Sequence, residues 1–481
     1  MRKTLPAFSF LILLPLLSAQ QPSVPAQPAP SAQPPAPAQP FANAAAAGQT
    51  ENTPAVQFQF TKVDDALLAE ADAVDREFEK KGLVLHDPAV QAYIDSVGNR
   101  VLASRPVPVK VTYRFVVLRD PDVNAFSLPN GSVYISTGLL ALLVNEGELA
   151  GVLGHETAHV YERHSYLENR SIRKKSVTLN ILAIVASVTP IGPGAGGIAG
   201  AAVYAAAEIS SLVLVESVFG YSREMERQAD SDGIVAMAAV GYNPHAMAAT
   251  FELLDADRTL EYEPYHTLYH DHPKLQEREV AATEYADKHT PAGARIGSEK
   301  DYLAAVAPAI VSNINTDIES RRPRTAVARA ARLVQAFPGD PLYQVLLGES
   351  YRALGAKTKI PTPDELTPDG EDKQRKLMIK MTEQQEQQKL LQTPEGRAML
   401  KENQASAEKS FLAAIQNHLD YAPGYRELGF LYEDETRYAD AATNYQHYLQ
   451  LVVNTSLDHL RIERRLAAVQ SLQAAQPPQA H

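Results

Sequence analysis

The feature that most constrains this chain is the stretch His155-Glu156-Thr157-Ala158-His159, which has the pattern H-E-x-x-H. On a helix, two residues four apart lie one turn apart on one face, so His155 and His159 can bind the same metal ion. Two imidazoles and a carboxylate suit zinc and leave a fourth position for water. Glu156 stands beside the first ligand, where it can take a proton from that water. The pattern predicts one zinc ion per chain.

The third ligand must come from elsewhere in the sequence. The metzincin pattern would require Gly and His at positions 162 and 165, which are Glu162 and Ser165 here, so that class is excluded. Another common solution is a carboxylate from a later helix. Glu226 and Asp230 are four apart and share a helix face. One of them can bind zinc, while the other orients a ligand His through its second ring nitrogen.

Several motifs in the same order resemble the M48 family of zinc metallopeptidases over roughly residues 60–285. Those around the metal ligands are His155-Glu156-x-x-His159 with Arg163-His164, and Ser222-Arg223-x-x-Glu226-x-x-Ala229-Asp230. Further matches are Asn124-Ala125-Phe126, Gly131, Ser136-Thr137-Gly138-Leu139-Leu140, His272-Pro273 and Arg278.

The resemblance implies an α+β zincin-like peptidase domain, mainly helical with a small sheet. It assigns zinc to His155, His159 and Glu226, and the role of general base to Glu156. Asp230 and His164 are candidates for orienting the ligands, and Arg223 is a weaker candidate for orienting Glu226 or the transition-state oxyanion. His272 is the candidate for a self-inhibitory ligand that occupies the open position on zinc, with His270 ranked second.

The small sheet should come before the motif. Residues 66–81 and 88–103 read as helices. Residues 109–118 alternate as a strand, residues 128–131 form a turn, and residues 132–136 form a second strand. The resemblance implies that this second strand lies at the sheet edge beside the metal, where a peptide can add as a further strand. An ordinary hairpin is the alternative. The substrate-binding candidates are Asn124, Ser132, Val133 and Tyr134.

The N-terminus is typical of export. Residues 1–19 combine a basic start, a short apolar core and small residues at the end, as in a cleaved signal peptide. A transmembrane anchor is the alternative, but the apolar run is short and contains two prolines. Residues 20–58 are rich in Pro, Ala and Gln and are expected to form a disordered linker. The predicted location is the periplasm. The absence of cysteine excludes disulfides and thiol chemistry.

Residues 177–219 form two apolar arms around a segment rich in Gly and Pro. No Gly-Lys-Ser/Thr follows, so this is not a phosphate loop. Two short buried or interfacial helices are one interpretation, and a membrane hairpin is the other. Neither arm clearly reaches the roughly 20 apolar residues of a span. The sequence therefore favours segments that do not cross a membrane, with peripheral membrane contact left open.

The C-terminal part is expected to be an all-α domain of tetratricopeptide-like repeats. The predicted peptidase domain covers residues 59–290, and the repeat domain follows it at residues 300–472. The repeat domain contains a charged insert at 356–404, and a disordered tail is expected at 473–481. The best match is Tyr425-x-x-Leu428-Gly429-x-x-Tyr432 with Ala441 and Tyr445, and part of the signature recurs at Leu347-Gly348-x-x-Tyr351. A plain helical bundle is the alternative. Stacked repeats would provide a concave surface for a protein partner.

Together these features predict an exported zinc endopeptidase that cleaves misfolded or stalled envelope polypeptides. By resemblance, its substrates would be outer-membrane proteins, and the repeats would dock on the β-barrel assembly machinery. The net charge of -12, without a basic cluster, argues against nucleic acid as a partner. Two alternatives remain: a chaperone or assembly adaptor with an autoinhibited peptidase site, and a peptidase acting on envelope lipoproteins or peptides.

Overall fold

The computed structural model describes residues 58–174, 221–260, 275–320, 322–355, 389–416, 418–453 and 456–475. The predicted signal peptide, all of the predicted linker except Phe58, and the apolar segment 177–219 lie outside these residues. Within the described ranges, no helix is both long enough and apolar enough to cross a membrane. The N-terminal elements are α1 (Lys62–Lys80), α2 (Pro88–Leu102), β1 (Arg114–Leu118), β2 (Ala125–Ser127), β3 (Ser132–Ser136), α3 (Thr137–Leu142), α4 (Glu146–Tyr161) and α5 (His164–Lys174).

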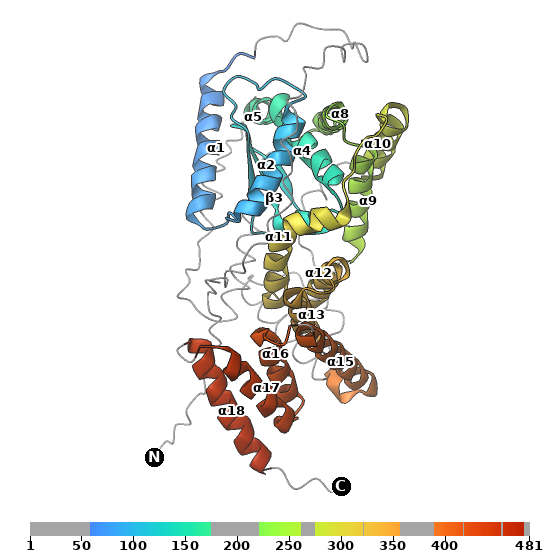
Figure 1. Cartoon of the computed structure of the whole chain (residues 1–481). Coiled ribbons are helices and arrows are strands. Elements are labelled where there is room, and N and C mark those ends of the chain that lie inside the picture. Colours follow the sequence, from blue (N-terminus) through green and yellow to red (C-terminus); the bar gives the residue numbers. More distant parts are fainter. Residues whose placement is uncertain are drawn as a thin grey trace, which may run out of the picture.

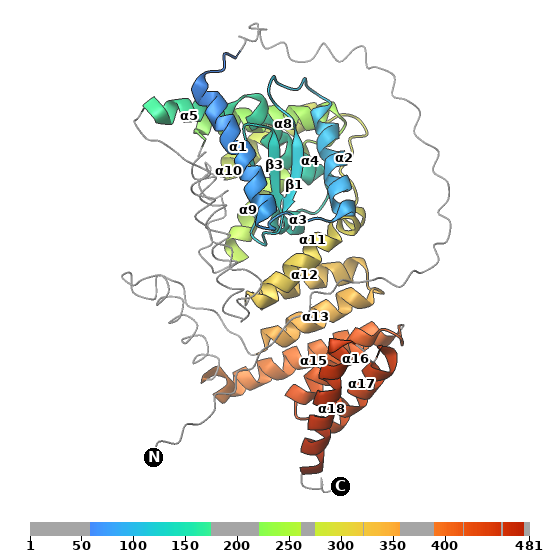
Figure 2. The same ribbon diagram turned by 90° about the vertical axis from the view of Figure 1, so that its left-hand side faces the viewer.

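A small sheet forms the middle layer of the N-terminal half, and its strand order is β1-β3-β2. β1 pairs with β3 in parallel, and β2 pairs with β3 in the antiparallel sense. Alternate side chains enter two separate cores, as the two-residue period of a strand requires. Phe115, Val117 and Val133 pack with α2 and α4, whereas Phe126 and Tyr134 pack with α1 on the opposite face. Figure 2 shows α1 in front of the strands and α4 behind them.

Local sequence explains where the first two helices begin. Thr61 and Asp64 form a capping box at the start of α1, and Asp87 caps α2 by accepting from two backbone N–H groups. Asp64 is fully buried and also pairs with Arg170 of α5. This ion pair ties the N-terminal helix to the helix that follows the H-E-x-x-H motif.

Two predictions about the sheet are wrong. The first strand begins at Arg114, because the chain turns at residues 109–110 and Lys110 adopts a positive φ of 62°. The strand of residues 132–136 is central, so its backbone is already paired on both sides. The edge next to it is β2, which the alternation pattern did not reveal because strand order is set by distant pairings.

The remaining helices extend the molecule away from the sheet. They are α8 (Arg223–Ala239), α9 (His245–Leu260), α10 (Leu275–His289), α11 (Glu299–Glu319), α12 (Pro323–Ala336), α13 (Pro341–Leu354), α15 (Pro394–Gln416), α16 (Ala422–Asp434), α17 (Tyr438–Leu451) and α18 (Leu457–Ala475). From α12 onward each described helix packs on the described helix before it, and Figure 1 shows the series descending from the sheet to the C-terminus. The described part is therefore mostly helical with one small sheet, as predicted.

The same kind of packing contact occurs in two helix pairs of the C-terminal series. A Cβ on Gly348 of α13 would lie 2.3 Å from the ring of Phe411 on α15. A Cβ on Gly429 of α16 would lie 2.2 Å from the ring of Tyr445 on α17. In both pairs a glycine makes room for a buried aromatic ring of the next described helix. The tetratricopeptide assignment itself stays a prediction.

The structure shifts three predicted boundaries. Residues 394–404 of the predicted insert belong to α15, where Gly396 and Asn403 are buried. Residues 473–475 of the predicted tail belong to α18. The boundary near residue 300 does not coincide with a break in packing, because buried residues of α11, α12 and α13 belong to the same core as α2, α4 and the sheet. α15 to α18 form a third core, which Val345 of α13 joins.

Candidate metal centre

The helix α4 carries the H-E-x-x-H motif through the middle of the N-terminal half. Asn145 caps it by accepting from the Glu148 N–H group, and every residue from Gly147 to Val160 is buried. A helix buried on all sides has neighbours around its whole circumference. α4 contacts α2, α5, α8, α9, β2 and β3. Its polar residues His155, Glu156 and His159 are therefore held inside the fold.

Two glycines bring α8 against α4 at the motif. A Cβ on Gly154 would lie 2.8 Å from the Gly233 carbonyl oxygen, and a Cβ on Gly233 would lie 2.7 Å from the His155 nitrogen. Both distances are too short for a real side chain, so the two backbones are in direct contact. This approach places the first turns of α8 beside the histidines.

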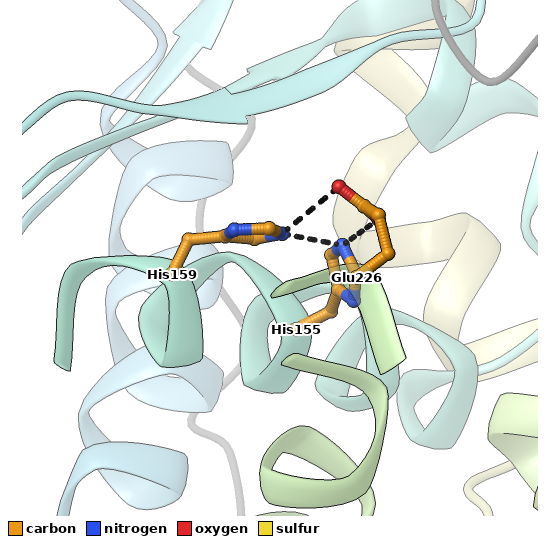
Figure 3. A group of neighbouring side chains, drawn as sticks. All are labelled: His155, His159 and Glu226. Atoms are coloured by element: carbon orange, nitrogen blue, oxygen red, sulfur yellow. Dashed lines mark hydrogen bonds and ion pairs between the residues drawn. The ribbon is translucent and has the colours of Figure 1, made fainter. Parts of the chain in front are cut away.

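Three side chains from α4 and α8 converge on one point (Figure 3). The Nε2 atoms of His155 and His159 are 3.0 Å apart. Glu226 Oε2 lies 3.5 Å from His155 Nε2, and Glu226 Oε1 lies 3.7 Å from His159 Nε2. All three side chains are buried, with exposed fractions of 3%, 2% and 0%. This is the predicted ligand set, assembled in one place.

The spacing of these donor atoms fits a tetrahedral zinc ion. Zinc binds histidine nitrogen and carboxylate oxygen at about 2.0–2.2 Å, so two ligand atoms at a tetrahedral angle lie about 3.3–3.5 Å apart. The three residues can each offer an atom within 4.8 Å of the others. Buried carboxylates ordinarily pair with a cation or coordinate a metal. Glu226 faces the imidazoles of His155 and His159, which bind a metal in their neutral form. The residues therefore fit the group that the sequence predicts.

Asp230 orients His155 through the ring nitrogen that does not face the metal site. Its Oδ1 atom lies 2.9 Å from His155 Nδ1, and Arg278 of α10 approaches both carboxylate oxygens, at 2.7 and 2.8 Å. Burial raises the pKa of Asp230, but the charge of Arg278 and the hydrogen bond with His155 outweigh it and hold the pKa at about 2. An ionised Asp230 can only accept, so His155 carries its proton on Nδ1 and keeps Nε2 free.

A different set of groups surrounds the second histidine. His159 Nδ1 lies 3.0 Å from His164 Nδ1, at the start of α5. The ring of Tyr221 stacks on His159 at 4.0 Å between centroids, and its hydroxyl lies 2.8 Å from Ser165 Oγ. Burial lowers the pKa of His164, which favours its neutral form. The ring of His159 is thus fixed in both position and tilt.

Not all sequence-predicted residues join the centre. Arg223 is exposed at the first turn of α8, whereas Arg278 lies 4.0 Å from Glu226. Ser132, Val133 and Tyr134 are buried in the central strand, with the Ser132 and Tyr134 hydroxyls bonded to Asp75. Asn124 precedes the edge strand β2 and is also buried. The switch candidates His272 and His270 lie outside the described residues.

Three residues at the centre had no predicted role. Arg278 appeared only as part of a resemblance, while Tyr221 and Gln228 were not singled out. Gln228 lies two residues after Glu226, and its Oε1 atom is 3.3 Å from His164 Nε2. Each of these contacts joins different elements, so sequence spacing carries no signal for them. Only Arg278 could have been expected from the sequence, since a partly buried acid such as Asp230 needs a cation.

Comparison with known proteins agrees with this geometry. The pattern of peptidase family M48 matches residues 88–286. A Vibrio cholerae relative provisionally given the name beta-barrel assembly-enhancing protease is 30% identical over 257 residues, which cover 53% of this chain and 51% of the relative. The beta-barrel assembly-enhancing protease of Escherichia coli K12 is 28% identical over 232 residues, or 48% and 45% of the two chains.

A mitochondrial relative matches over a shorter stretch. The mitochondrial metalloendopeptidase OMA1 of Schizosaccharomyces pombe is 31% identical over 165 residues, or 34% of this chain and 44% of that protein. The matched part thus spans about half the length of these relatives, or somewhat less.

Proposed function

We propose that the chain is a zinc-dependent endopeptidase, because residues 88–286 match peptidase family M48. The observation that carries the proposal is the convergence of His155, His159 and Glu226, buried and spaced for one metal ion. His155 and His159 would bind through Nε2 and Glu226 through its carboxylate. Zinc in such a site acidifies a coordinated water and polarises a carbonyl group.

Glu156 is the proton carrier of the proposed reaction. It follows His155 on α4 and is buried, with 5% of its surface exposed. A carboxylate in this position takes a proton from the attacking water and later gives it to the leaving amine, so that the peptide bond is replaced by a carboxylate and an amine. Arg278 and Asp230 hold His155 in place throughout and do not exchange protons with the substrate.

Peptide recognition is proposed at the edge strand β2. In the described part of the chain β2 has one neighbouring strand, β3, so its other side can accept an extended peptide through main-chain hydrogen bonds. β2 also contacts α4, which carries the motif. Ala125, Phe126 and Ser127 are buried in this structure, so an incoming strand must displace the atoms that cover them. Recognition through the main chain would give little sequence preference.

The cellular role is proposed from the names of the relatives. Two of them are called beta-barrel assembly-enhancing proteases, and a signal peptide at residues 1–19 would place this chain in the periplasm. The substrates would be misfolded or stalled envelope polypeptides, including outer-membrane proteins. The helical series from α12 to α18 would contact a protein partner, with the β-barrel assembly machinery as the first to test. Contact of residues 177–219 with a membrane surface belongs to the same proposal.

The test of this function is a comparison of purified residues 20–481 with Glu156→Gln, using metal analysis and casein cleavage. We expect stoichiometric zinc in both proteins and cleavage only in the wild type. Glu168→Gln on α5 is the matched control and should cleave like the wild type. His272→Ala should raise cleavage if His272 occupies the open position, and His270→Ala tests the second candidate. A wild-type protein that holds zinc but cleaves nothing in every variant would contradict the proposal.

An adaptor without proteolysis is the second candidate, and the burial of the metal ligands and of β2 favours it. The two functions separate in cells that lack the protein. If Glu156→Gln restores envelope integrity as well as the wild type does, the protein acts as a scaffold. If the variant is stably produced and does not restore it, the protein acts as a protease.

A further inference from the structure

A row of four polar side chains leads from the metal centre to the surface. It begins at His159 Nδ1, which lies 3.0 Å from His164 Nδ1. His164 Nε2 lies 3.3 Å from Gln228 Oε1, and Gln228 Nε2 lies 2.7 Å from Glu162 Oε2. The four residues come from α4, the residue that follows it, the start of α5 and α8. Three different parts of the chain therefore meet in one hydrogen-bonded row.

The chemistry of the outer end fixes the direction of every hydrogen bond in this row. Burial raises the pKa of Glu162 to about 7, and its deprotonated form can only accept, so Gln228 presents its NH2 group to Glu162 and its carbonyl oxygen to His164. The carbonyl oxygen also accepts, so His164 carries its proton on Nε2. A neutral His164 then has an unprotonated Nδ1, which accepts a hydrogen bond from the Nδ1–H group of His159. The Nε2 atom of His159, which faces His155 and Glu226, therefore carries the lone pair that binds a metal.

We propose that Gln228 is a positioning residue that selects the metal-binding tautomer of His159, acting through His164. The inference rests on the proposed zinc site and adds a residue to it. The two histidine ligands differ in this respect. His155 has a charged acceptor, Asp230, which is locked by Arg278. The Nδ1 atom of His159 lies instead beside the imidazole of His164, which in turn contacts the amide of Gln228.

The relay can be reversed by one substitution. Gln228→Lys replaces an acceptor with a group that only donates. A lysine at this position would donate to His164 Nε2 as well as to Glu162, and His164 would then carry its proton on Nδ1. His159 would have to accept at Nδ1 and carry its own proton on Nε2, where it blocks the metal. Gln228→Glu keeps a hydrogen-bond acceptor for His164. The side chain in Gln228→Leu can neither accept nor donate a hydrogen bond.

Gln228 suits such a test because its side chain is exposed on α8, so these changes leave the core intact. The full-length protein would be titrated with zinc in competition with a chromophoric chelator. We expect affinity near the wild-type value for Gln228→Glu, a loss for Gln228→Leu and the largest loss for Gln228→Lys. The largest loss should be on the order of 10–100-fold, the size typical of groups behind a metal ligand. Arg227→Leu, at the adjacent exposed position, is the control and should bind zinc like the wild type.

A second readout does not depend on the metal. Nitrogen-15 spectra of the metal-free protein report the tautomers of His159 and His164, which should invert in Gln228→Lys and stay unchanged in Arg227→Leu. Unchanged tautomers and unchanged zinc affinity in Gln228→Lys would overturn the inference. If the wild type itself binds no zinc, the proposed function fails instead, while the tautomer spectra still decide whether Gln228 sets the proton of His159.

Discussion

At the scale of single residues, the metal centre of the metal-free protein carries more acidic than basic side chains. Glu226 and Asp230 are acids, and Arg278 is the cation that pairs with Asp230 and lies 4.0 Å from Glu226. One acid thus has its own cation at hydrogen-bonding distance, and the other faces two imidazole nitrogens. Buried charges require such compensation. A divalent ion between His155, His159 and Glu226 supplies it for the second acid.

Removing the charge of Asp230 should weaken metal binding without removing a ligand. Asp230→Asn leaves Arg278 without its carboxylate partner and gives His155 a weaker acceptor, so the ring loses its fixed tautomer. We expect zinc affinity to fall on the order of 10–100-fold. The measurement is competition with a chromophoric chelator, beside Asp287→Asn on α10, whose side chain is 66% exposed. Equal affinity in both variants would show that Asp230 does not orient His155.

How much of the centre was predictable depends on whether its residues share an element. His155, Glu156 and His159 lie within one helical turn, and Glu226 and Asp230 lie on one face of another helix, so spacing alone revealed them. Tyr221 and Gln228 act on histidines that are far away in sequence. Their contacts arise only when α4, α5 and α8 pack together. No periodicity in the sequence encodes that packing.

At the scale of elements, the contact between α4 and α8 decides the geometry of the centre. α8 supplies Glu226, and its distance from the histidines is set by the backbone contact at Gly154 and Gly233. Helix prediction succeeded for α1 and α2 because their apolar residues repeat with a helical period. Prediction of the edge strand failed, because the order β1-β3-β2 depends on which strands meet across the chain.

A methyl group at the crossing point should disturb the centre. In Gly154→Ala the new Cβ would lie 2.8 Å from the Gly233 carbonyl oxygen, so α4 and α8 must move apart. Overpacking of this kind costs about 1–3 kcal/mol of stability. The same shift moves Glu226 away from His155, so zinc affinity should also fall. Denaturant unfolding of the metal-free protein and zinc competition would measure the two effects.

Gly151 provides the matched control on the same helix. A Cβ there would lie 3.3 Å from Met247, a tight but tolerable contact. Alanine also favours a helix over glycine by about 1 kcal/mol, which offsets the crowding. Gly151→Ala should therefore stay close to the wild type in both measurements. Equal behaviour of the two variants would show that the backbone contact at Gly154 does not set the position of α8.

At the scale of the whole molecule, the helices after residue 298 complete the domain that holds the metal centre. The Tyr302 hydroxyl donates to the Leu140 carbonyl, and Arg332 donates to the Ala141 and Leu143 carbonyls at the end of α3. Thr137 donates to Asn313 of α11. α11 and α12 thereby hold the end of the helix that leads into α4. The sequence predicted a boundary near residue 300 from the change to repeat motifs, but composition does not show which core a helix joins.

Two fragments should show whether the domain that holds the metal centre ends near residue 300 or includes α11 to α13. Residues 58–298 lack α11, whose fully buried residues Tyr302, Leu303, Val306, Ile310 and Ile314 pack in the N-terminal core. Each such side chain contributes about 1.5–3 kcal/mol, so their loss is comparable to the whole stability of a domain, about 5–15 kcal/mol. This fragment should fail to fold, whereas residues 58–355 retain α11, α12 and α13 and should fold. Circular dichroism and zinc binding would follow both, and a folded 58–298 fragment with full zinc affinity would restore the boundary at residue 300.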